Sequence, residues 1–163
     1  MSDDIAAARA ALKTIPGFED YRGVIVRLGG MTNLVFRMGD FCLRIPGKGT
    51  EEYINRANES VMAWEAARAG VSPEVLHADP VTGVMVTRFV AGAETMTPKN
   101  FRSRVGSPAR AGEVFRRLHD SGAKFPFRFE LFAMIDDYLK VLSGKDVALP
   151  SGYHEVVREA DQN

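Results

Sequence analysis

The order of β-type and helical patterns along the chain is the feature that most constrains its fold. Short runs rich in β-branched and aromatic residues occur within residues 24–46 and 75–89, and they predict five strands. One helical pattern separates these two stretches, and only helical patterns follow residue 93. Since only Gly39 and Asp40 separate the second strand from the third, we expect a type II′ hairpin there. The order predicts an α+β fold in which a five-stranded antiparallel sheet with one main helix precedes a set of helices.

Turn residues and helix caps suggest where each element begins and ends. We predict strands at 24–28, 33–38, 41–45, 75–78 and 84–89, and helices at 6–12, 51–69, 108–121 and 129–142. The main helix is expected to have Thr50 as its N-cap, with Glu51 and Glu52 at the positive end of its dipole. For the next helix we expect Ser107 as the N-cap, followed by Pro108. The apolar residues of the main helix form one predicted stripe, made of Ile54, Ala57, Val61 and Trp64.

Charge and composition exclude several classes of protein. The chain of 163 residues has 21 Lys and Arg against 21 Asp and Glu, so there is no bulk charge to attract nucleic acid or an anionic membrane. No apolar run approaches the roughly 20 residues that span a bilayer. The acidic start at Asp3 and Asp4 is not typical of a secretory signal, and the single Cys42 excludes an intrachain disulfide. We therefore expect a cytoplasmic protein that binds neither membrane nor nucleic acid.

A glycine-rich turn between the first two predicted strands is the first candidate for ligand binding. Gly29 and Gly30 allow backbone N–H groups to approach an anion closely. The side chains of Thr32 and Asn33 follow directly and add hydrogen-bond donors. Taken alone, such a turn is more often just an ordinary hairpin connection.

An arginine and a glutamate form the second candidate. Arg44 alternates with Leu43 and Ile45 on the third predicted strand, so its side chain points to the opposite face from theirs. Glu59 lies in the main helix and is expected to meet Arg44 where the helix joins the sheet. A cation held by a carboxylate over a glycine-rich turn is the way kinase-type folds position nucleotide phosphates. The alternative is an ion pair with a purely structural role.

Several segments, taken in order, resemble the choline/ethanolamine kinase family. They are Leu28–Asn33, Cys42–Gly47, Glu59–Met62 and Val84–Phe89, followed by Arg116–Asp120 and Phe132–Asp136. This family belongs to the aminoglycoside-phosphotransferase-like small-molecule kinases, which share the protein-kinase fold. The resemblance implies a nucleotide-binding N-lobe over residues 1–92, then a connector and the first helices of a C-lobe over residues 93–163.

The resemblance also implies roles for individual residues. The implied ATP site consists of Gly29, Gly30, Thr32, Asn33, Arg44, Glu59, Arg88, Phe89 and Val90. In it the glycine turn covers the phosphates, while Arg44 takes the place of the phosphate-binding lysine of protein kinases and Glu59 is its partner. The backbone groups of Arg88 and Val90 are expected to bond the adenine from the connector.

One part of the family pattern is missing. Family members carry a catalytic His-x-Asp followed by Asn, and then a metal-binding Asp, but neither His119 nor His154 begins a His-x-Asp sequence. The resemblance therefore implies that the catalytic base and the Mg²⁺ ligands lie outside this chain, which we expect to be the N-terminal part of a longer kinase. The implied reaction is phosphoryl transfer from MgATP to the hydroxyl of choline, ethanolamine or a similar amino alcohol, with thiamine or an aminoglycoside as further candidates.

Two other functions stay open at this point. The chain could be a kinase-like module that binds a nucleotide or a protein partner without catalysis. The basic stretch 99–128, with its interleaved phenylalanines, could bind RNA, although solvated helix faces are the simpler explanation of that pattern. Apolar faces on the helices that carry Phe115 and Phe132 lead us to expect self-association, as a homodimer.

Overall fold

A computed structural model describes residues 3–30, 32–50, 54–128, 130–145 and 147–160. The chain divides into two compact units, Met1–Phe127 and Arg128–Asn163. The first unit holds the sheet and the helices that come before, between and after its strands. The second holds two helices. This division lies after residue 127, whereas the predicted lobe boundary lies after residue 92. The lobe boundary stays a prediction.

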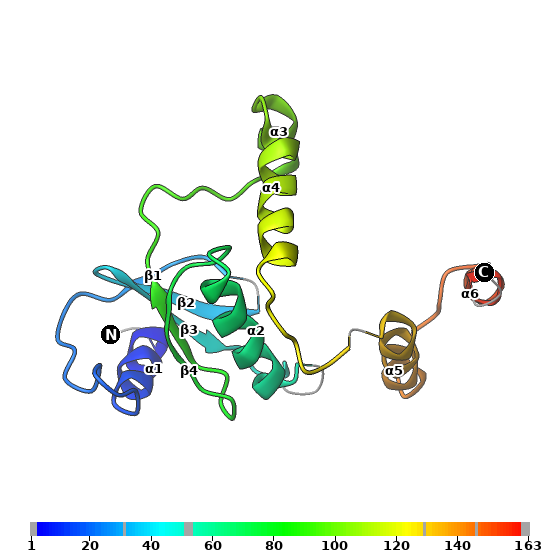
Figure 1. Ribbon diagram of the computed structural model, residues 1–163. Coiled ribbons are helices and arrows are strands. Elements are labelled where there is room, and N and C mark those ends of the chain that lie inside the picture. Colours follow the sequence, from blue (N-terminus) through cyan, green and yellow to red (C-terminus); the bar gives the residue numbers. More distant parts are fainter. Residues whose placement is uncertain (1–2, 31, 51–53, 129, 146, 161–163) are drawn as a thin grey trace. The chain divides into compact units, whose positions relative to one another are not determined.

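The first unit is built on the five-stranded antiparallel sheet that the sequence predicted (Figure 1). Its elements are α1 (Asp3–Leu12), β1 (Val26–Arg27), β2 (Asn33–Met38), β3 (Phe41–Pro46), α2 (Arg56–Arg68), β4 (Val75–Ala78), β5 (Met85–Arg88), α3 (Pro98–Ser103) and α4 (Ser107–Asp120). The strands lie in the order β1-β2-β3-β5-β4, and each neighbouring pair is antiparallel. The fold class is therefore confirmed.

The β2–β3 hairpin has the predicted turn. Met38 pairs with Phe41, so only Gly39 and Asp40 form the connection. Gly39 has a φ of +60°, whereas no residue other than glycine has a positive φ in the described part of the chain, which places Asp40 at negative φ. A positive φ at the first position alone is the signature of a type II′ turn.

The hydrophobic core lies between α1 and one face of the sheet. Phe36, Leu43 and Val86 come from three neighbouring strands, and each side chain is 0% exposed. They form one cluster with Ala8 and Leu12 of α1. Because side chains alternate along a strand, the residues between them point to the other face of the sheet. That second face carries Val35, Cys42, Arg44, Met85 and Thr87, and all five are partly exposed.

Helix α2 begins later than predicted. Its N-cap is Asn55, whose side chain accepts a 3.0 Å hydrogen bond from the Asn58 amide. The prediction of Thr50 as N-cap is wrong, because the Thr50 hydroxyl instead donates to the Gly47 carbonyl at 2.8 Å. Glu51 and Glu52 lie outside the described residues.

Helix α2 contacts the sheet through a buried polar residue. The predicted stripe is not its buried side, since Ala57 is exposed and Ser60 is the buried residue of the helix. The Ser60 hydroxyl donates to the Ala78 carbonyl of β4 at 3.1 Å. Apolar periodicity alone missed this contact because a buried serine contributes nothing to a hydrophobic stripe.

Helix α4 also starts differently from the prediction. Gly106 is its N-cap, with φ +77° and no side-chain cap. Ser107 is therefore the first helical residue, and its hydroxyl donates to the Arg104 carbonyl at 2.9 Å. The short helix α3 before it, capped by Thr97, was not predicted.

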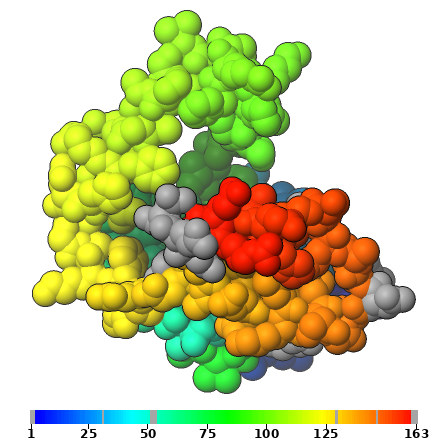
Figure 2. Space-filling model, turned by 90° about the vertical axis from the view of Figure 1, so that its right-hand side faces the viewer, coloured from blue at the N-terminus to red at the C-terminus, as the bar shows by residue number. Residues whose placement is uncertain are grey.

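The second unit consists of α5 (Leu131–Ser143) and α6 (Tyr153–Ala160), coloured orange and red in Figure 2. Helix α5 agrees with the prediction, whereas α6 lies in a tail with no strong sequence pattern. Large apolar side chains are exposed in both units, as Phe115 at 61% and Phe132 at 54% show. Of the helices that the structure describes, none has the length and apolarity to cross a bilayer.

Candidate functional site

The predicted contact between Arg44 and Glu59 is present. Strand β3 directs Arg44 onto the second face of the sheet, and α2 brings Glu59 to it from the helix side. Arg44 Nη1 donates to Glu59 Oε1 at 2.8 Å, and the two side chains are only 24% and 22% exposed. Arg44 Nη2 also donates to the Gly83 carbonyl at 3.3 Å. A charge-assisted pair in this degree of burial holds the guanidinium in a defined place.

A second arginine, which the sequence analysis missed, shares the same carboxylate. Arg56 Nη1 donates to Glu59 Oε2 at 3.0 Å, and the Arg56 side chain is only 9% exposed. Burial alone would raise the pKa of Glu59, but hydrogen bonds from Arg44 and Arg56 outweigh it and lower that pKa. The i, i+3 spacing of Arg56 and Glu59 on a predicted helix was the signal that could have revealed this contact.

The glycine turn folds back on the start of β2. Gly30 has a φ of +148°, and a Cβ there would lie 2.5 Å from the Asn33 carbonyl oxygen, so the position requires glycine. The same Cβ would lie 3.4 Å from Val35, which pairs directly with Arg44. The turn therefore borders the second face beside Arg44. Around Gly29, by contrast, a Cβ would meet nothing within 4 Å.

The two polar side chains of the turn differ in burial. Thr32 is exposed, whereas Asn33 is partly buried and donates weakly to the Thr32 hydroxyl at 3.4 Å. Asn33 Oδ1 and Arg44 Nε are buried without a hydrogen-bond partner among the residues that the structure describes. Unpaired buried polar atoms are uncommon in native proteins, and here both belong to predicted site residues.

The predicted connector residues lie at the end of β5. The Phe89 amide donates to the Asp40 carbonyl at 2.8 Å, and the Arg37 guanidinium lies 4.2 Å from the centre of the Phe89 ring. The Arg88 side chain pairs with Glu74 at 3.1 Å, away from Arg44. Within the described ranges no backbone carbonyl accepts from the Val90 amide, and Val90 is 50% exposed.

Between the connector and Arg44, the second face is a mainly apolar surface that sequence reasoning also missed. Cys42 pairs with Thr87 across β3 and β5, and Val35 and Met85 flank Arg44. Burial raises the pKa of the Cys42 thiol, although a hydrogen bond with Thr87 acts in the opposite direction. At neutral pH the thiol is thus a small neutral group in this surface. The alternation of side chains along each strand, combined with the pairing register, was the signal that could have revealed these residues on one face.

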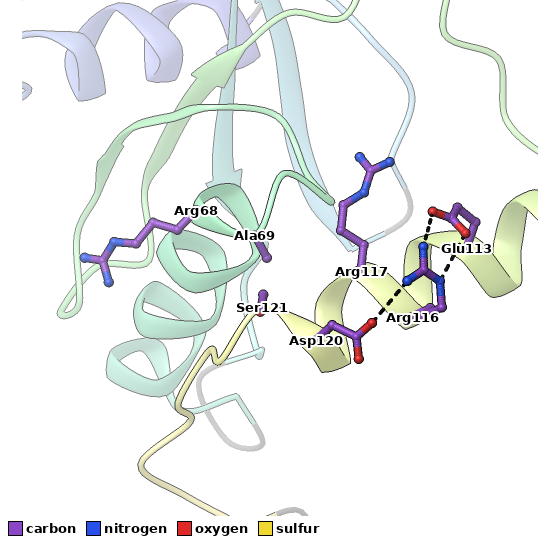
Figure 3. Close-up of a pocket in the computed structure, with 7 residues that line it drawn as sticks. All are labelled: Arg68, Ala69, Glu113, Arg116, Arg117, Asp120 and Ser121. Atoms are coloured by element: carbon purple, nitrogen blue, oxygen red, sulfur yellow. Dashed lines mark hydrogen bonds and ion pairs between the residues drawn. The ribbon is translucent and has the colours of Figure 1, made fainter.

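A separate hollow of about 410 Å³ lies between the end of α2 and α4 (Figure 3). Both acids that line it are paired, since Arg116 contacts Glu113 at 2.8 Å and Asp120 at 3.2 Å. Arg117 donates to the Gly70 carbonyl at 3.5 Å, and Arg68 points away from the hollow. A single arginine thus takes both acids of the basic stretch 99–128, which keeps its excess of positive charge, so RNA binding stays an alternative.

Known proteins agree with the resemblance seen in the sequence. No protein-family model matches the chain. A choline/ethanolamine kinase family protein from Mesorhizobium loti has a solved structure that is 69% identical, with a TM-score of 0.81 over 97% of this chain and 52% of that one. Over nearly all of its own length the chain is similar to about half of this choline/ethanolamine kinase family protein.

More distant relatives are named LicA. Protein LicA of Haemophilus influenzae is 29% identical over 122 residues, which are 72% of this chain and 36% of that protein. A structure of LicA in complex with AMP shares the fold, with 22% identity and a TM-score of 0.61 over 83% of this chain and 47% of that one. The chain thus spans about a third of the curated relative and about half of each solved one. The roles of the nine predicted site residues stay predictions.

The charge state of Glu59 leads to a prediction about how the stability of the fold depends on pH. Because the folded state lowers the pKa of Glu59, its ionised form stabilises the fold above the unfolded value of about 4.3, and this contribution is lost as the pH falls through the folded pKa. Glu59→Gln should cost about 1.5–3 kcal/mol at pH 7, the range for hydrogen bonds to a charged group, and much less at pH 3.

Thermal unfolding at pH 7 and pH 3 measures this difference. Glu65→Gln is the matched control, because Glu65 lies on the same helix and pairs with Arg68, which is 70% exposed. If the stability difference between wild type and Glu59→Gln were the same at both pH values, the folded state would not lower the pKa of Glu59.

Proposed function

We propose that the chain supplies the ATP-binding lobe of a small-molecule kinase. The complete reaction transfers the γ-phosphoryl group of ATP to the hydroxyl of choline, ethanolamine or a similar amino alcohol. The observation that carries this proposal is Arg44, held by Glu59 at 2.8 Å on a sheet face that a glycine turn borders. The Mesorhizobium loti relative and the AMP complex of LicA support it.

The phosphates are proposed to lie against the end of the second face where the charges gather. Arg44, Arg56 and Glu59 together carry one net positive charge. The planar fork of an arginine matches two phosphate oxygens, and the backbone N–H groups near Gly29 and Gly30 can approach an anion without obstruction by side chains. In this arrangement Glu59 orients Arg44 and leaves the cluster positive.

The adenine is proposed to lie along the apolar part of the same face. Cys42 and Thr87 line it beside the connector, and Val35 lies between them and the glycine turn. The Val90 amide and the Arg88 carbonyl are the backbone groups expected to bond the base edge. This layout puts an apolar surface under the ring and cationic groups under the phosphates, as a nucleotide requires.

Catalysis needs groups that the described residues do not offer. No cluster of three or more His, Cys, Asp or Glu suited to a metal occurs in the ranges that the structure covers, and both oxygens of Glu59 are taken by arginines. These residues therefore do not fit Mg²⁺. We place the Mg²⁺ ligands and the catalytic base in the part of the relatives that this chain does not match, so the chain alone is expected to bind ATP without turnover.

We infer a cytoplasmic protein that takes a small amino alcohol and binds neither nucleic acid nor membrane. The exposed helix faces that carry Phe115 in the first unit and Phe132 in the second are two separate candidate surfaces for a homodimer. Sedimentation of the purified chain tests whether a homodimer forms.

Calorimetric titration with ATP tests the function. We expect saturable binding of ATP and no binding of polyuridylate at the same ionic strength, and ³¹P NMR should detect no phosphocholine when choline and MgATP are added. A flat ATP titration would contradict the proposal. Formation of phosphocholine would show that this chain contains a catalytic base, and would refute our assignment of catalysis to groups outside it.

A further inference from the structure

We propose that Arg56 is a positioning residue that connects the glycine turn to Arg44 and keeps both in place for the phosphates. This inference rests on the proposed function. It goes beyond it by assigning a role to a residue that no kinase-like motif in the sequence includes. The Arg56 guanidinium is nine-tenths buried and contacts two different parts of the site.

One arm of Arg56 leads to the glycine turn. Arg56 Nη2 donates to the Thr50 hydroxyl, which in turn donates to the Gly47 carbonyl at 2.8 Å. Gly47 packs directly on the turn, because a Cβ there would lie 2.0 Å from the Thr32 carbonyl oxygen. A continuous series of contacts therefore runs from Thr32 through Gly47 and Thr50 to Arg56.

The other arm leads to Arg44. Arg56 Nη1 contacts Glu59 Oε2 at 3.0 Å, and Glu59 Oε1 contacts Arg44 Nη1 at 2.8 Å. Each carboxylate oxygen thus takes one guanidinium. Because a carboxylate with both oxygens engaged cannot rotate without losing a charge-assisted bond, Arg56 restricts the orientation of Glu59 and hence that of Arg44.

Gly83 makes this arrangement sterically specific. A Cβ at Gly83 would lie 2.5 Å from Arg56 Cδ and 3.0 Å from Pro46 Cγ, and the residue has a φ of +72°. Its carbonyl accepts from Arg44 Nη2 at 3.3 Å. Both arginines therefore contact the turn before β5, and any side chain at Gly83 must displace Arg56.

The position of Arg56 in its helix is electrostatically unfavourable, which calls for compensating contacts. It is the first residue of α2, where the helix dipole disfavours a cation. Arg68, in the last turn of the same helix, has the favourable position and stays 70% exposed. Glu59 compensates the charge of Arg56 and the Thr50 hydroxyl accepts one of its hydrogen bonds, so the buried cation is stable at the place where it joins the glycine turn to Arg44.

Nucleotide binding by the 163-residue chain tests the proposal, with Arg68→Ala as the matched control. We expect Arg56→Ala to weaken ATP binding about tenfold and to leave adenosine binding, followed by NMR titration, unchanged, because adenosine has no phosphate. Arg68→Ala should change neither. Gly83→Ala, which displaces Arg56 without removing its charge, should also weaken ATP selectively.

Amide hydrogen exchange tests the positioning role without nucleotide. In Arg56→Ala the amides of the glycine turn should exchange several-fold faster than in Arg68→Ala. Unchanged exchange and unchanged ATP affinity would overturn the inference, and so would an equal loss of ATP and adenosine, which indicates a general structural defect. If wild type fails to bind ATP, the proposed function falls, whereas the exchange measurement still decides whether Arg56 positions the turn.

Discussion

Replacing Arg44 with alanine is expected to weaken ATP binding by about 100-fold. The substitution removes a guanidinium that Glu59 holds at 2.8 Å on the face where the phosphates are proposed to bind. Hydrogen bonds to charged groups contribute about 1.5–3 kcal/mol each, and about 1.4 kcal/mol corresponds to a factor of ten in affinity. Two such bonds to phosphate oxygens, each near the lower end of that range, therefore account for the expected loss.

Calorimetric titration of wild type, Arg44→Ala and Arg44→Lys measures this effect. Lysine keeps the charge but not the planar fork, so its affinity should fall between the other two. The fold is expected to survive, because Glu59 keeps its contact with Arg56 at 3.0 Å in the alanine variant. Equal affinities for wild type and Arg44→Ala would mean that the nucleotide binds elsewhere.

The second large effect is expected in the core. Phe36→Ala should lower the free energy of unfolding by about 3–5 kcal/mol, the usual cost of removing a buried aromatic ring. Phe36 is 0% exposed and belongs to the cluster that joins the sheet to α1. Since the total stability of a domain is about 5–15 kcal/mol, this one change removes a large part of it.

Urea denaturation of Phe36→Ala, Val81→Ala and wild type measures the free energy of unfolding of each. Val81→Ala is the control, because Val81 is 83% exposed in the turn before β5 and should change the free energy by no more than about 0.5 kcal/mol. Similar midpoints for Phe36→Ala and wild type would show that the sheet face against α1 is not the main core.

Helix starts illustrate where sequence reasoning was wrong. Thr50 and Asn55 are both residue types that cap helices, and the sequence alone offers no basis for choosing between them. In the fold the Thr50 hydroxyl bonds Gly47 and Arg56, and Asn55 caps α2 instead. Which of the two residues caps α2 was therefore decided by the contacts of Thr50 with Gly47 and Arg56, and these form only in the folded chain.

The sequence by itself determined the strands, the type II′ turn at Gly39, the α+β order and the facing of Arg44 away from the core. All of these follow from local periodicity and turn chemistry, which act over a few residues. It also placed Glu59 on the helix that meets Arg44.

Only the tertiary structure decided which distant groups share that site. Arg56 and Gly83 meet because the start of α2 and the turn before β5 come together, and Gly47 touches Thr32 because the two turns at one end of the sheet pack on each other. Such contacts depend on the path of the whole backbone, and no short-range pattern records that path. The charge balance of the cluster, with two arginines for one glutamate, therefore emerges only when the chain is folded.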